Sequence, residues 1–422
     1  MNEAKPGAAN VYASQLLTKE LGFPVEFDTN LSPIVSQWSE TCSEMKSRTN
    51  AIKNFFSGTI SFAISSTLSA DQLPLRSLLL GGREHGGFDL AAHRAMAENV
   101  SLIPKSYRTD EPVPGKIAEI QCPGSVWAEY CIALDAFDRN AGDAYVRRLH
   151  RHLFEANRAS TAHHLLDNSS RPLTSLYLIQ RLRRTCHVSF FGFDKITDRE
   201  CRLVRSHSFK GLVSQNIFSD RLAAAAKDEV VFDYPPTQIF DQKLPLALPF
   251  HPLTKHYYSD DIRKHIAPTY LLSSDLNFFT GTEKLSLDSV MSWPRQRRPY
   301  VLKYAGQDTT RNWGSRAVFM LNRFSKRAWA NIRDRIVSDL QRGEPWIVQE
   351  DLSRKQSMQP VLGGYDTGQN SPNLAYEKSS IFVAGDVTVG AATMYRKTSL
   401  VHGQQDTILR AYTIEAAGAK NA

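Results

Sequence analysis

The stretch GKIAEIQCPGS (residues 115–125) places the carboxylate of Glu119 two residues before the amide of Gln121, and Pro123-Gly124 then ends the extended run. Side chains two residues apart on a β-strand point to the same face of the sheet. Carboxylate and amide oxygens are hard ligands, which magnesium takes alongside phosphate oxygens and water. The stretch therefore predicts a short strand whose end offers two oxygen ligands on one face.

A second extended run, SYRTD (106–110), has the same spacing and carries Arg108 and Asp110. The turn-rich EPVPG (111–115) separates the two runs, and Pro and Gly between extended runs are typical of a β-hairpin. If the hairpin forms, all four polar side chains line one surface. That surface either holds a metal ion and phosphate or is a solvated face of a sheet, and the two runs alone leave both interpretations open.

The composition is that of an ordinary globular protein, with 42% hydrophobic and 22% charged residues in 422 positions,. This length suffices for two or three domains, each with its own core. No run of eighteen apolar residues and no signal-peptide pattern occurs, so we expect a soluble, cytoplasmic protein without membrane contacts. Five cysteines without a Cys-x-x-Cys pair argue against a disulfide framework and against structural zinc,.

A formal net charge of +8 suits a polyphosphate ligand, nucleic acid or an acidic membrane,. The densest basic stretches are RRLHRH (147–152), RLRR (181–184) and RQRR (295–298). Because no aromatic-interleaved RNA motif or recognition-helix pattern accompanies them, we favour solvated helix faces and a loop. A basic, non-catalytic α/β protein that binds nucleic acid stays open as an alternative.

Four regions are expected along the chain. Residues 1–100 are predicted to be mainly helical, with a strand pair near 58–68 and 74–82 and a contribution to a substrate pocket. Residues 101–170 hold the hairpin and following helices, including one helix over 126–142 that ends at its glycine. Residues 171–285 contain short β-rich runs typical of an α/β layer, and 286–422 alternate strands with one amphipathic helix. We also predict a hairpin turning at Gly385-Asp386 and a mobile loop over 362–377.

Several residues are candidates for chemistry without forming a decisive motif. Lys303 ends a strand before a loop rich in small residues (306–314), so it is suited to neutralise a polyphosphate, although a lone strand-end lysine is usually a surface residue,. We interpret His93 and the pair His163-His164 as structural, since no carboxylates stand at ligand spacing. The absence of Gly-x-Ser-x-Gly argues against a serine hydrolase.

The order of these features resembles that of the ATP-grasp ligases in their circularly permuted arrangement, similar to glutathionylspermidine synthetase. In that arrangement the metal-binding strands precede the ATP lysines. The resemblance covers roughly 100–130 and 230–410, about half of the chain. It implies an α/β (α+β) ATP-grasp fold with the nucleotide between two α/β subdomains. The segment YRTDEPVPGKIAEIQCPGS resembles the group's Arg-x-Asp, hairpin and Glu-x-Asn elements.

The resemblance implies a role for each matching residue of the hairpin. Arg108 would contact the transferred phosphate, and Asp110, Glu119 and Gln121 would hold Mg²⁺. Gln121 stands where the family usually has Asn, and its oxygen has one more methylene of reach. The separation of Asp110 from Glu119 is shorter than the family pattern.

Further segments resemble the family's ATP-binding elements. FDQKLPLALPF would supply the first ATP lysine and YVLKYAG the second, followed by a phosphate lid and, in WIVQEDL, an adenine connector. VGAATMYRKTSLVHG resembles the closing strand, whose arginine could face the phosphates or the acyl substrate. The implied ATP-binding residues are Lys243, Lys303, Gly306, Arg311, Asn312, Gly314, Ser315, Arg316, Val348, Gln349 and Glu350, and the closing arginine is Arg396.

The resemblance implies an ATP-dependent ligase that forms a C–N bond between a small-molecule carboxylic acid and an amine through an acyl phosphate. ATP and Mg²⁺ are the expected cofactors, and no nucleic-acid partner is expected. A small-molecule kinase is the alternative within the same fold. A homodimer is compatible with the family, although nothing in the sequence specifies one.

Overall fold

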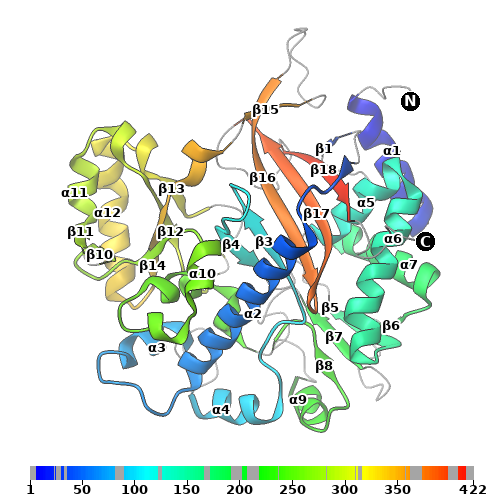
Figure 1. The fold of residues 1–422 in the computed structure, drawn as a ribbon, viewed down its shortest axis with the longest axis horizontal. Helices are drawn as coiled ribbons and strands as arrows, with labels where there is room; N and C mark the ends of the chain where they lie inside the picture. The colour runs from blue at the N-terminus through cyan, green and yellow to red at the C-terminus, as the bar shows by residue number, and fades with distance from the viewer. Residues whose placement is uncertain are drawn as a thin grey trace.

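The structure is a computed structural model. It describes residues 6–22, 24, 30–32, 36–80, 90–121, 126–165, 172–191, 202–206, 218–235, 237–281, 283–308, 310–311, 316–356, 358–361, 373–397 and 407–414. The fold is a mixed α/β fold in which a large central sheet stands between a lobe rich in helices and a smaller α/β lobe (Figure 1).

The central sheet has eight strands and is antiparallel except at one edge. Its strand order is β1-β18-β17-β16-β3-β4, with β15 pairing with β16 and β2 pairing with β18. The bounds are β1 (Asn30–Leu31), β2 (Ser36–Gln37), β3 (Ser106–Glu111), β4 (Glu119–Gln121), β15 (Met358–Val361), β16 (Asn373–Ala384), β17 (Val387–Arg396) and β18 (Ile408–Thr413). The short strands β1 and β2 run parallel to β18.

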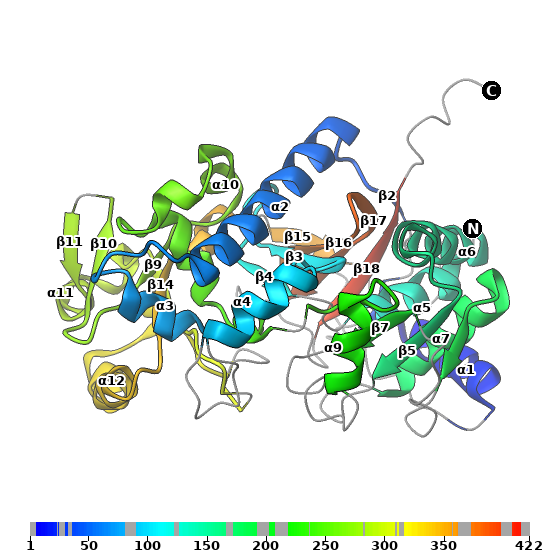
Figure 2. The ribbon, with the colours of Figure 1, turned by 90° about the horizontal axis from the view of Figure 1, so that it is seen from below.

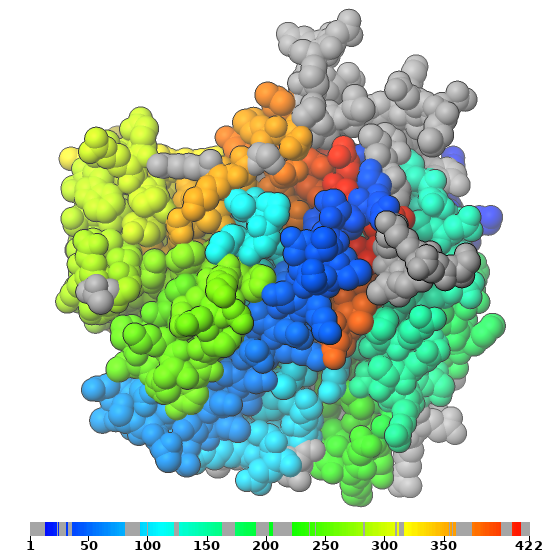
Figure 3. All heavy atoms as spheres, viewed as in Figure 1, coloured from blue at the N-terminus to red at the C-terminus, as the bar shows by residue number. Residues whose placement is uncertain are grey.

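Apolar layers cover both faces of this sheet, which is why every residue of β3 is buried. On one face, Phe56 of α2 (Cys42–Ile64) packs edge-on against Tyr107, with ring centroids 5.2 Å apart. On the other, Phe382 packs against Trp127 of α5 (Trp127–Phe137). Figure 2 shows α2 and α5 on opposite sides of the central strands. In the space-filling view, α2 lies at the surface beside the β3–β4 turn and the segment near residue 260 (Figure 3).

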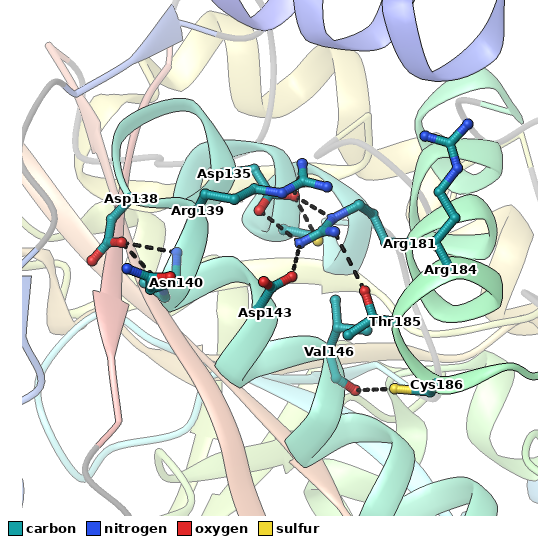
Figure 4. A network of polar contacts seen from close by, with 12 residues as sticks. Asp135, Asp138, Arg139, Asn140, Asp143, Val146, Arg181, Arg184, Thr185 and Cys186 are labelled. Carbon is teal, nitrogen blue, oxygen red and sulfur yellow. Dashed lines mark hydrogen bonds and ion pairs between the residues drawn. The ribbon is translucent and has the colours of Figure 1, made fainter.

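The helical lobe consists of α1 (Pro6–Leu21), α5, α6 (Arg139–Leu149) and α7 (Pro172–Cys186). A buried ion-pair network joins three of these helices (Figure 4). Arg181 of α7 donates to both carboxylate oxygens of Asp135 on α5, at 2.7 and 3.0 Å, and to Asp143 of α6 at 2.7 Å. Arg181 is 2% exposed, so the two carboxylates compensate a charge that water cannot reach,.

A parallel sheet of order β6-β5-β7-β8 lies next to the helical lobe. Its strands are β5 (Thr161–Leu165), β6 (Ser189–Phe191), β7 (Leu203–Ser206) and β8 (Val231–Phe232). The helices α3 (Leu73–Leu80) and α4 (Leu90–Asn99) pack against α2, and α9 (Phe218–Ala226) packs against α4. The predicted α/β layer in the middle of the chain is confirmed.

The smaller lobe is built on an antiparallel sheet of order β13-β12-β14-β9. Its strands are β9 (Thr269–Leu271), β12 (Tyr300–Tyr304), β13 (Val318–Met320) and β14 (Trp346–Glu350), and the hairpin β10 (Asn277–Thr280) and β11 (Glu283–Ser286) lies beside it. Helices α11 (Leu287–Ser292) and α12 (Lys326–Gln341) pack against these strands, whereas α10 (Asp260–His265) packs against α2. The predicted strands and amphipathic helix of this region are confirmed.

Three sequence-based expectations are wrong. Residues 58–64 belong to α2 and residues 74–80 to α3, so the expected strand pair is helical. The helix expected over 126–142 is interrupted at Asp138, whose extended backbone lets its carboxylate accept from the first amides of α6,. Gly142 lies inside α6 instead of ending a helix, and a Cβ there would collide with the Asp135 carboxylate.

The loop expected over 362–377 lies only partly within the described residues. Residues 373–377 form the start of β16 and are therefore not a loop, whereas 362–372 lie outside the described residues. The hairpin turn at Gly385-Asp386 is confirmed, and Gly385 adopts a positive φ of 57° there,. No helix within the described ranges has both the length and the apolar character needed to cross a bilayer.

Candidate functional site

The β3–β4 hairpin brings Arg108, Asp110, Glu119 and Gln121 onto one face of the central sheet. The two strands pair antiparallel, with Arg108 opposite Gln121 and Asp110 opposite Glu119. Directly opposite residues of an antiparallel pair point to the same side, so the predicted common surface of the four side chains is confirmed. The hairpin turn is fastened to α10, because the Ile117 amide donates to the His265 carbonyl at 2.7 Å.

The carboxylate of Asp110 is buried and saturated with hydrogen bonds. Arg108 donates to both of its oxygens, through Nε at 3.0 Å and Nη2 at 3.1 Å. From the neighbouring strand β16, Lys378 donates to Oδ2 at 2.7 Å and Ser380 donates to Oδ1 at 2.8 Å. A carboxylate has about four lone-pair sites, and these four donors fill them. Burial alone would raise the pKa of Asp110, but Arg108 and Lys378 outweigh it and hold that pKa well below its ordinary range,.

Glu119 and Gln121 are less constrained than Asp110. Lys243 lies 3.3 Å from Oε1 of Glu119, and the Glu119 side chain retains 27% exposure. Burial would raise the pKa of Glu119, but the cations of Lys243 and Lys303 outweigh this effect, so the pKa is lowered and the carboxylate is charged near neutral pH,. The amide oxygen of Gln121 is buried and accepts no hydrogen bond from the residues that the structure describes.

Lys303 of β12 carries a buried ammonium group at the junction of the central sheet and the smaller lobe. Its Nζ donates to Oε1 of Gln349 at 2.6 Å and to the Ala118 carbonyl at 3.2 Å. Burial lowers the pKa of Lys303 to about 8, although the nearby Glu119 carboxylate raises it,. Lys303 therefore contacts the hairpin at Ala118, the residue before Glu119.

We call a set of six charged residues, which gather at the face of the hairpin shared by Arg108 and Asp110, the cationic cluster; they are Arg108, Lys243, Lys303, Lys378, Asp110 and Glu119. When all six are ionised, positive charges exceed negative ones by two. The cations come from four different parts of the chain: β3, the residue before the 3₁₀ segment Leu244–Phe250, β12 and β16. A largely buried excess of positive charge is suited to a polyanion, because low polarity strengthens the attraction.

The oxygen donors of the cluster fit a magnesium ion only in part. Glu119 has an accessible carboxylate and Gln121 an unpartnered amide oxygen, so two protein oxygens fit an ion that takes its remaining ligands from phosphate and water,. The predicted role of Asp110 as a third ligand conflicts with its saturation by protein donors. Within the described ranges, no group of three or more His, Cys, Asp or Glu side chains is placed to hold a metal ion.

The segment expected to bind adenine, Val348 to Glu350, lies in the middle of a sheet. Strand β14 pairs with β12 on one side and with β9 on the other. Because Val348 and Gln349 have a paired strand on each side, they present no free strand edge to a flat base. The Val348 side chain is fully buried in the core, and Glu350 pairs with Lys355 at 3.2 Å.

The loop after β12 is described at residues 305–308, 310–311 and 316–317. Gly306 packs so closely on Tyr304 and Glu344 that a Cβ would collide with both side chains. Arg311 lies over the Tyr304 ring at 3.9 Å and donates to Asp339 of α12 at 2.7 Å, so its guanidinium is directed to the helix. Arg316 donates only weakly, at 3.4 Å, to the Thr310 carbonyl. The predicted lid residues Asn312, Gly314 and Ser315 lie outside the described residues.

Arg396 ends strand β17 on the same face of the central sheet as the cationic cluster. It pairs with Tyr376, two positions beyond the pair of Met394 with Lys378. Two residues along a strand span about 7 Å, so Arg396 lies about that far along the ladder from the position of Lys378.

His93 and the pair His163-His164 stand on elements other than those that carry the cationic cluster. His93 is fully buried, and its Nε2 lies 3.1 Å from the Thr237 hydroxyl, which agrees with a structural role. His163 and His164 are in strand β5, whose neighbours are β6 and β7 of the parallel sheet.

Sequence reasoning missed Lys378 and Ser380, the two residues of β16 that hold Asp110. Their spacing on a strand indicates a common face, and this is the one signal in the sequence that could have drawn attention to them,. Their contact with Asp110 depends on the pairing of β16 with β3, two strands far apart in the chain.

Comparisons with known proteins add little to this description. No family model and no curated protein matches the chain. Among solved structures, the chain is similar to a glutathione synthetase-like effector from Globodera pallida in its apo form, with a TM-score of 0.44, 11% sequence identity and coverage of 98% of each chain. A likeness of that size does not establish a family for this chain.

Proposed function

We propose that this chain binds ATP with Mg²⁺ at the cationic cluster and acts as an ATP-dependent carboxylate–amine ligase. The observation that carries the proposal is the convergence of Arg108, Lys243, Lys303 and Lys378 on one face of a hairpin, where Asp110 and Glu119 supply two carboxylates. A buried site with more cations than carboxylates suits a triphosphate. The order of the sequence motifs, which resembles that of permuted ATP-grasp ligases, supports the choice of reaction.

Each member of the cluster has a role in this proposal. Lys243 and Lys303 bind phosphate oxygens of ATP, and Arg108 contacts the phosphoryl group that is transferred. Glu119 and Gln121 hold Mg²⁺, which when bound neutralises phosphate charge. Asp110 acts differently from a metal ligand: by accepting from Arg108 and Lys378, it fixes both cations on the face of the sheet.

The proposed chemistry has two steps. The carboxylate of the acid substrate attacks the γ-phosphorus of ATP, so a P–O bond to the acid forms and the bond to ADP breaks, which gives an acyl phosphate. An amine then attacks the acyl carbon, forms the amide bond and expels phosphate, while one proton of the amine is released. Preorganised cations stabilise the charge that develops on the phosphoryl oxygens in the first step.

A second candidate function is a nucleotide binder without catalysis. The saturation of Asp110 favours it, because Glu119 and Gln121 are then the two oxygen ligands that the described part of the cluster offers to magnesium. Such a protein would bind ATP through the same cations and would not turn it over.

The test is ATP consumption in the presence of Mg²⁺ with pooled amino acids, dipeptides and polyamines, and with hydroxylamine to trap an acyl phosphate. ADP together with a hydroxamate supports the ligase. ADP with a stable phosphorylated product points to a small-molecule kinase instead. ATP binding without turnover supports the non-catalytic binder. Absence of both binding and turnover contradicts both candidates, and salt-sensitive binding of DNA or RNA would then support the nucleic-acid alternative.

A further inference from the structure

A chain of hydrogen bonds runs from Lys303 to a buried threonine that the proposed chemistry does not use. Lys303 donates to Oε1 of Gln349, and Nε2 of Gln349 donates to Oγ1 of Thr269 at 2.8 Å. The Thr269 hydroxyl in turn donates to the Ala267 carbonyl at 2.7 Å. Thr269 is fully buried and lies opposite Gln349 in the pairing of β9 with β14.

The direction of each bond in this chain is fixed by chemistry. A threonine hydroxyl has one hydrogen, and here the Ala267 carbonyl accepts it, so Oγ1 faces Gln349 as an acceptor,. The Gln349 amide must therefore turn its NH₂ group toward Thr269 and its oxygen toward Lys303. A flipped amide would place NH₂ against the ammonium, donor against donor.

A second acceptor supports the same orientation. The Ala118 carbonyl accepts from Nε2 of Gln349 at 3.3 Å and from Nζ of Lys303 at 3.2 Å. Ala118 immediately precedes Glu119, so the chain joins the smaller lobe to the hairpin that carries the candidate site. Two of the three N–H donors of Lys303 are used in this way within the described part of the chain, which leaves one for a ligand.

We propose that Thr269 is a positioning residue, which orients the Gln349 amide and through it holds the Lys303 ammonium in place for a phosphate oxygen. The part that concerns phosphate rests on the proposed function. The part that concerns the orientation of Lys303 does not, and it can be measured without ATP.

The matched variants are Thr269→Val, which keeps the shape and removes the hydroxyl, and Thr269→Ser, which restores it. In protein with ¹³C-labelled lysine, the Lys303 resonance is assigned with Lys303→Arg and titrated by NMR. Burial lowers the pKa of Lys303 to about 8 in the native protein. Without the Thr269 hydroxyl, the Gln349 amide oxygen is no longer fixed as an acceptor for the charged form of Lys303. We therefore expect Thr269→Val to lower the pKa of Lys303 by about one unit. Thr269→Ser should keep the native value.

ATP binding with Mg²⁺ is measured by calorimetry on the same proteins. We expect Thr269→Val to weaken binding about tenfold, the scale of one hydrogen bond to a charged group, and Thr269→Ser to bind as the native protein does. If Thr269→Val does not fold, Thr269→Ala is titrated in its place. An unchanged Lys303 titration in the folded variant overturns the inference. A shifted titration in a protein that fails to bind ATP supports the positioning of Lys303 and contradicts the proposed function.

Discussion

Lys378 on β16 donates a 2.7 Å hydrogen bond to Oδ2 of Asp110 on β3, although the two residues stand 268 positions apart in the chain. The contact exists because β16 pairs with β3 and places Ser380 directly opposite Asp110. Asp110, which the sequence pattern predicts to bind metal, therefore accepts hydrogen bonds from two buried cations, Arg108 and Lys378. Asp110 should therefore matter first for stability.

We expect Asp110→Asn to lower the free energy of unfolding by about 3–5 kcal/mol, because Arg108 and Lys378 would stay buried without a compensating charge. The control is Ser380→Ala, which removes a neutral donor from the same carboxylate and should cost about 1 kcal/mol. Urea denaturation of both variants measures the difference. Equal losses would show that the charge of Asp110 does not compensate these cations.

Glu119 should matter for turnover and little for stability. We expect Glu119→Gln to lower ATP turnover at least about a hundredfold, the scale expected when a preorganised charge is lost at the reacting phosphates. The control is Glu155→Gln, which removes a carboxylate that is 59% exposed and lies 3.2 Å from His150. Steady-state rates of ATP turnover, measured at several Mg²⁺ concentrations above that of ATP, check the prediction. Near-native turnover of the Glu119 variant would contradict the placement of Glu119 in the site.

Lys303 should make stability depend on pH in alkaline solution. Burial lowers the pKa of Lys303 to about 8, against an ordinary value of 10.5. Between these two values the unfolded chain binds a proton that the native protein has released, so stability should rise with pH across this window, by up to about 3 kcal/mol. We expect the rise to be absent in Lys303→Met. Urea denaturation at pH 7.5 and pH 10 compares the two proteins, and identical pH profiles would contradict the assignment.

The same titration predicts how nucleotide binding depends on pH. The charged form of Lys303 attracts phosphate, so affinity for ATP should fall as pH rises through about 8,. Calorimetry at pH 7 and pH 9 checks this expectation. Affinity that does not change between the two values would mean that Lys303 does not contact the phosphates.

The fold could be predicted from the sequence mainly where the signal was local. The β3–β4 hairpin, the strand that carries Lys303 and the turn at Gly385-Asp386 follow from strand periodicity and from Pro and Gly at the turns,. The strand expected over 58–68 is wrong because residues 58–64 continue a helix. The capping box of Thr41 and Glu44 starts a long helix, and tertiary packing of Phe55, Phe56 and Phe62 continues it through β-branched residues,.

The sequence could predict which residue types belong to the candidate site, but it could not predict the contacts between them. Sequence placed Arg108 and Asp110 on one face, but the partners of Asp110 come from a strand far along the chain. In the same way, β9 approaches β14 from the other side, which closes the backbone edge expected to bind adenine and lets Thr269 reach Gln349. Long-range strand order decides both outcomes, and no local pattern encodes it.

The helical lobe offers a prediction that is independent of the candidate site. We expect Asp135→Asn to destabilise the protein by about 3–5 kcal/mol, because it weakens the compensation of the buried Arg181 (Figure 4),. Asp143→Asn is the matched control, since its carboxylate contacts the same arginine and is one-third exposed, so its loss should cost about 1 kcal/mol or less. Thermal unfolding with ATP absent measures both. A similar loss of unfolding free energy in the two variants would contradict the expectation that the buried carboxylate of Asp135 contributes more than the partly exposed one of Asp143.

Equilibrium binding of ATP with Mg²⁺ tests the central claim most directly. The titration compares the native protein with Lys303→Met and with Lys284→Met, a lysine on the β10–β11 hairpin that is 55% exposed. If the cationic cluster holds a triphosphate, the native protein and Lys284→Met bind ATP equally, Lys303→Met binds it at least about tenfold more weakly, and AMP binds weakly to all three. Failure of the native protein to bind ATP, or equal affinity for ATP and AMP, would contradict the claim.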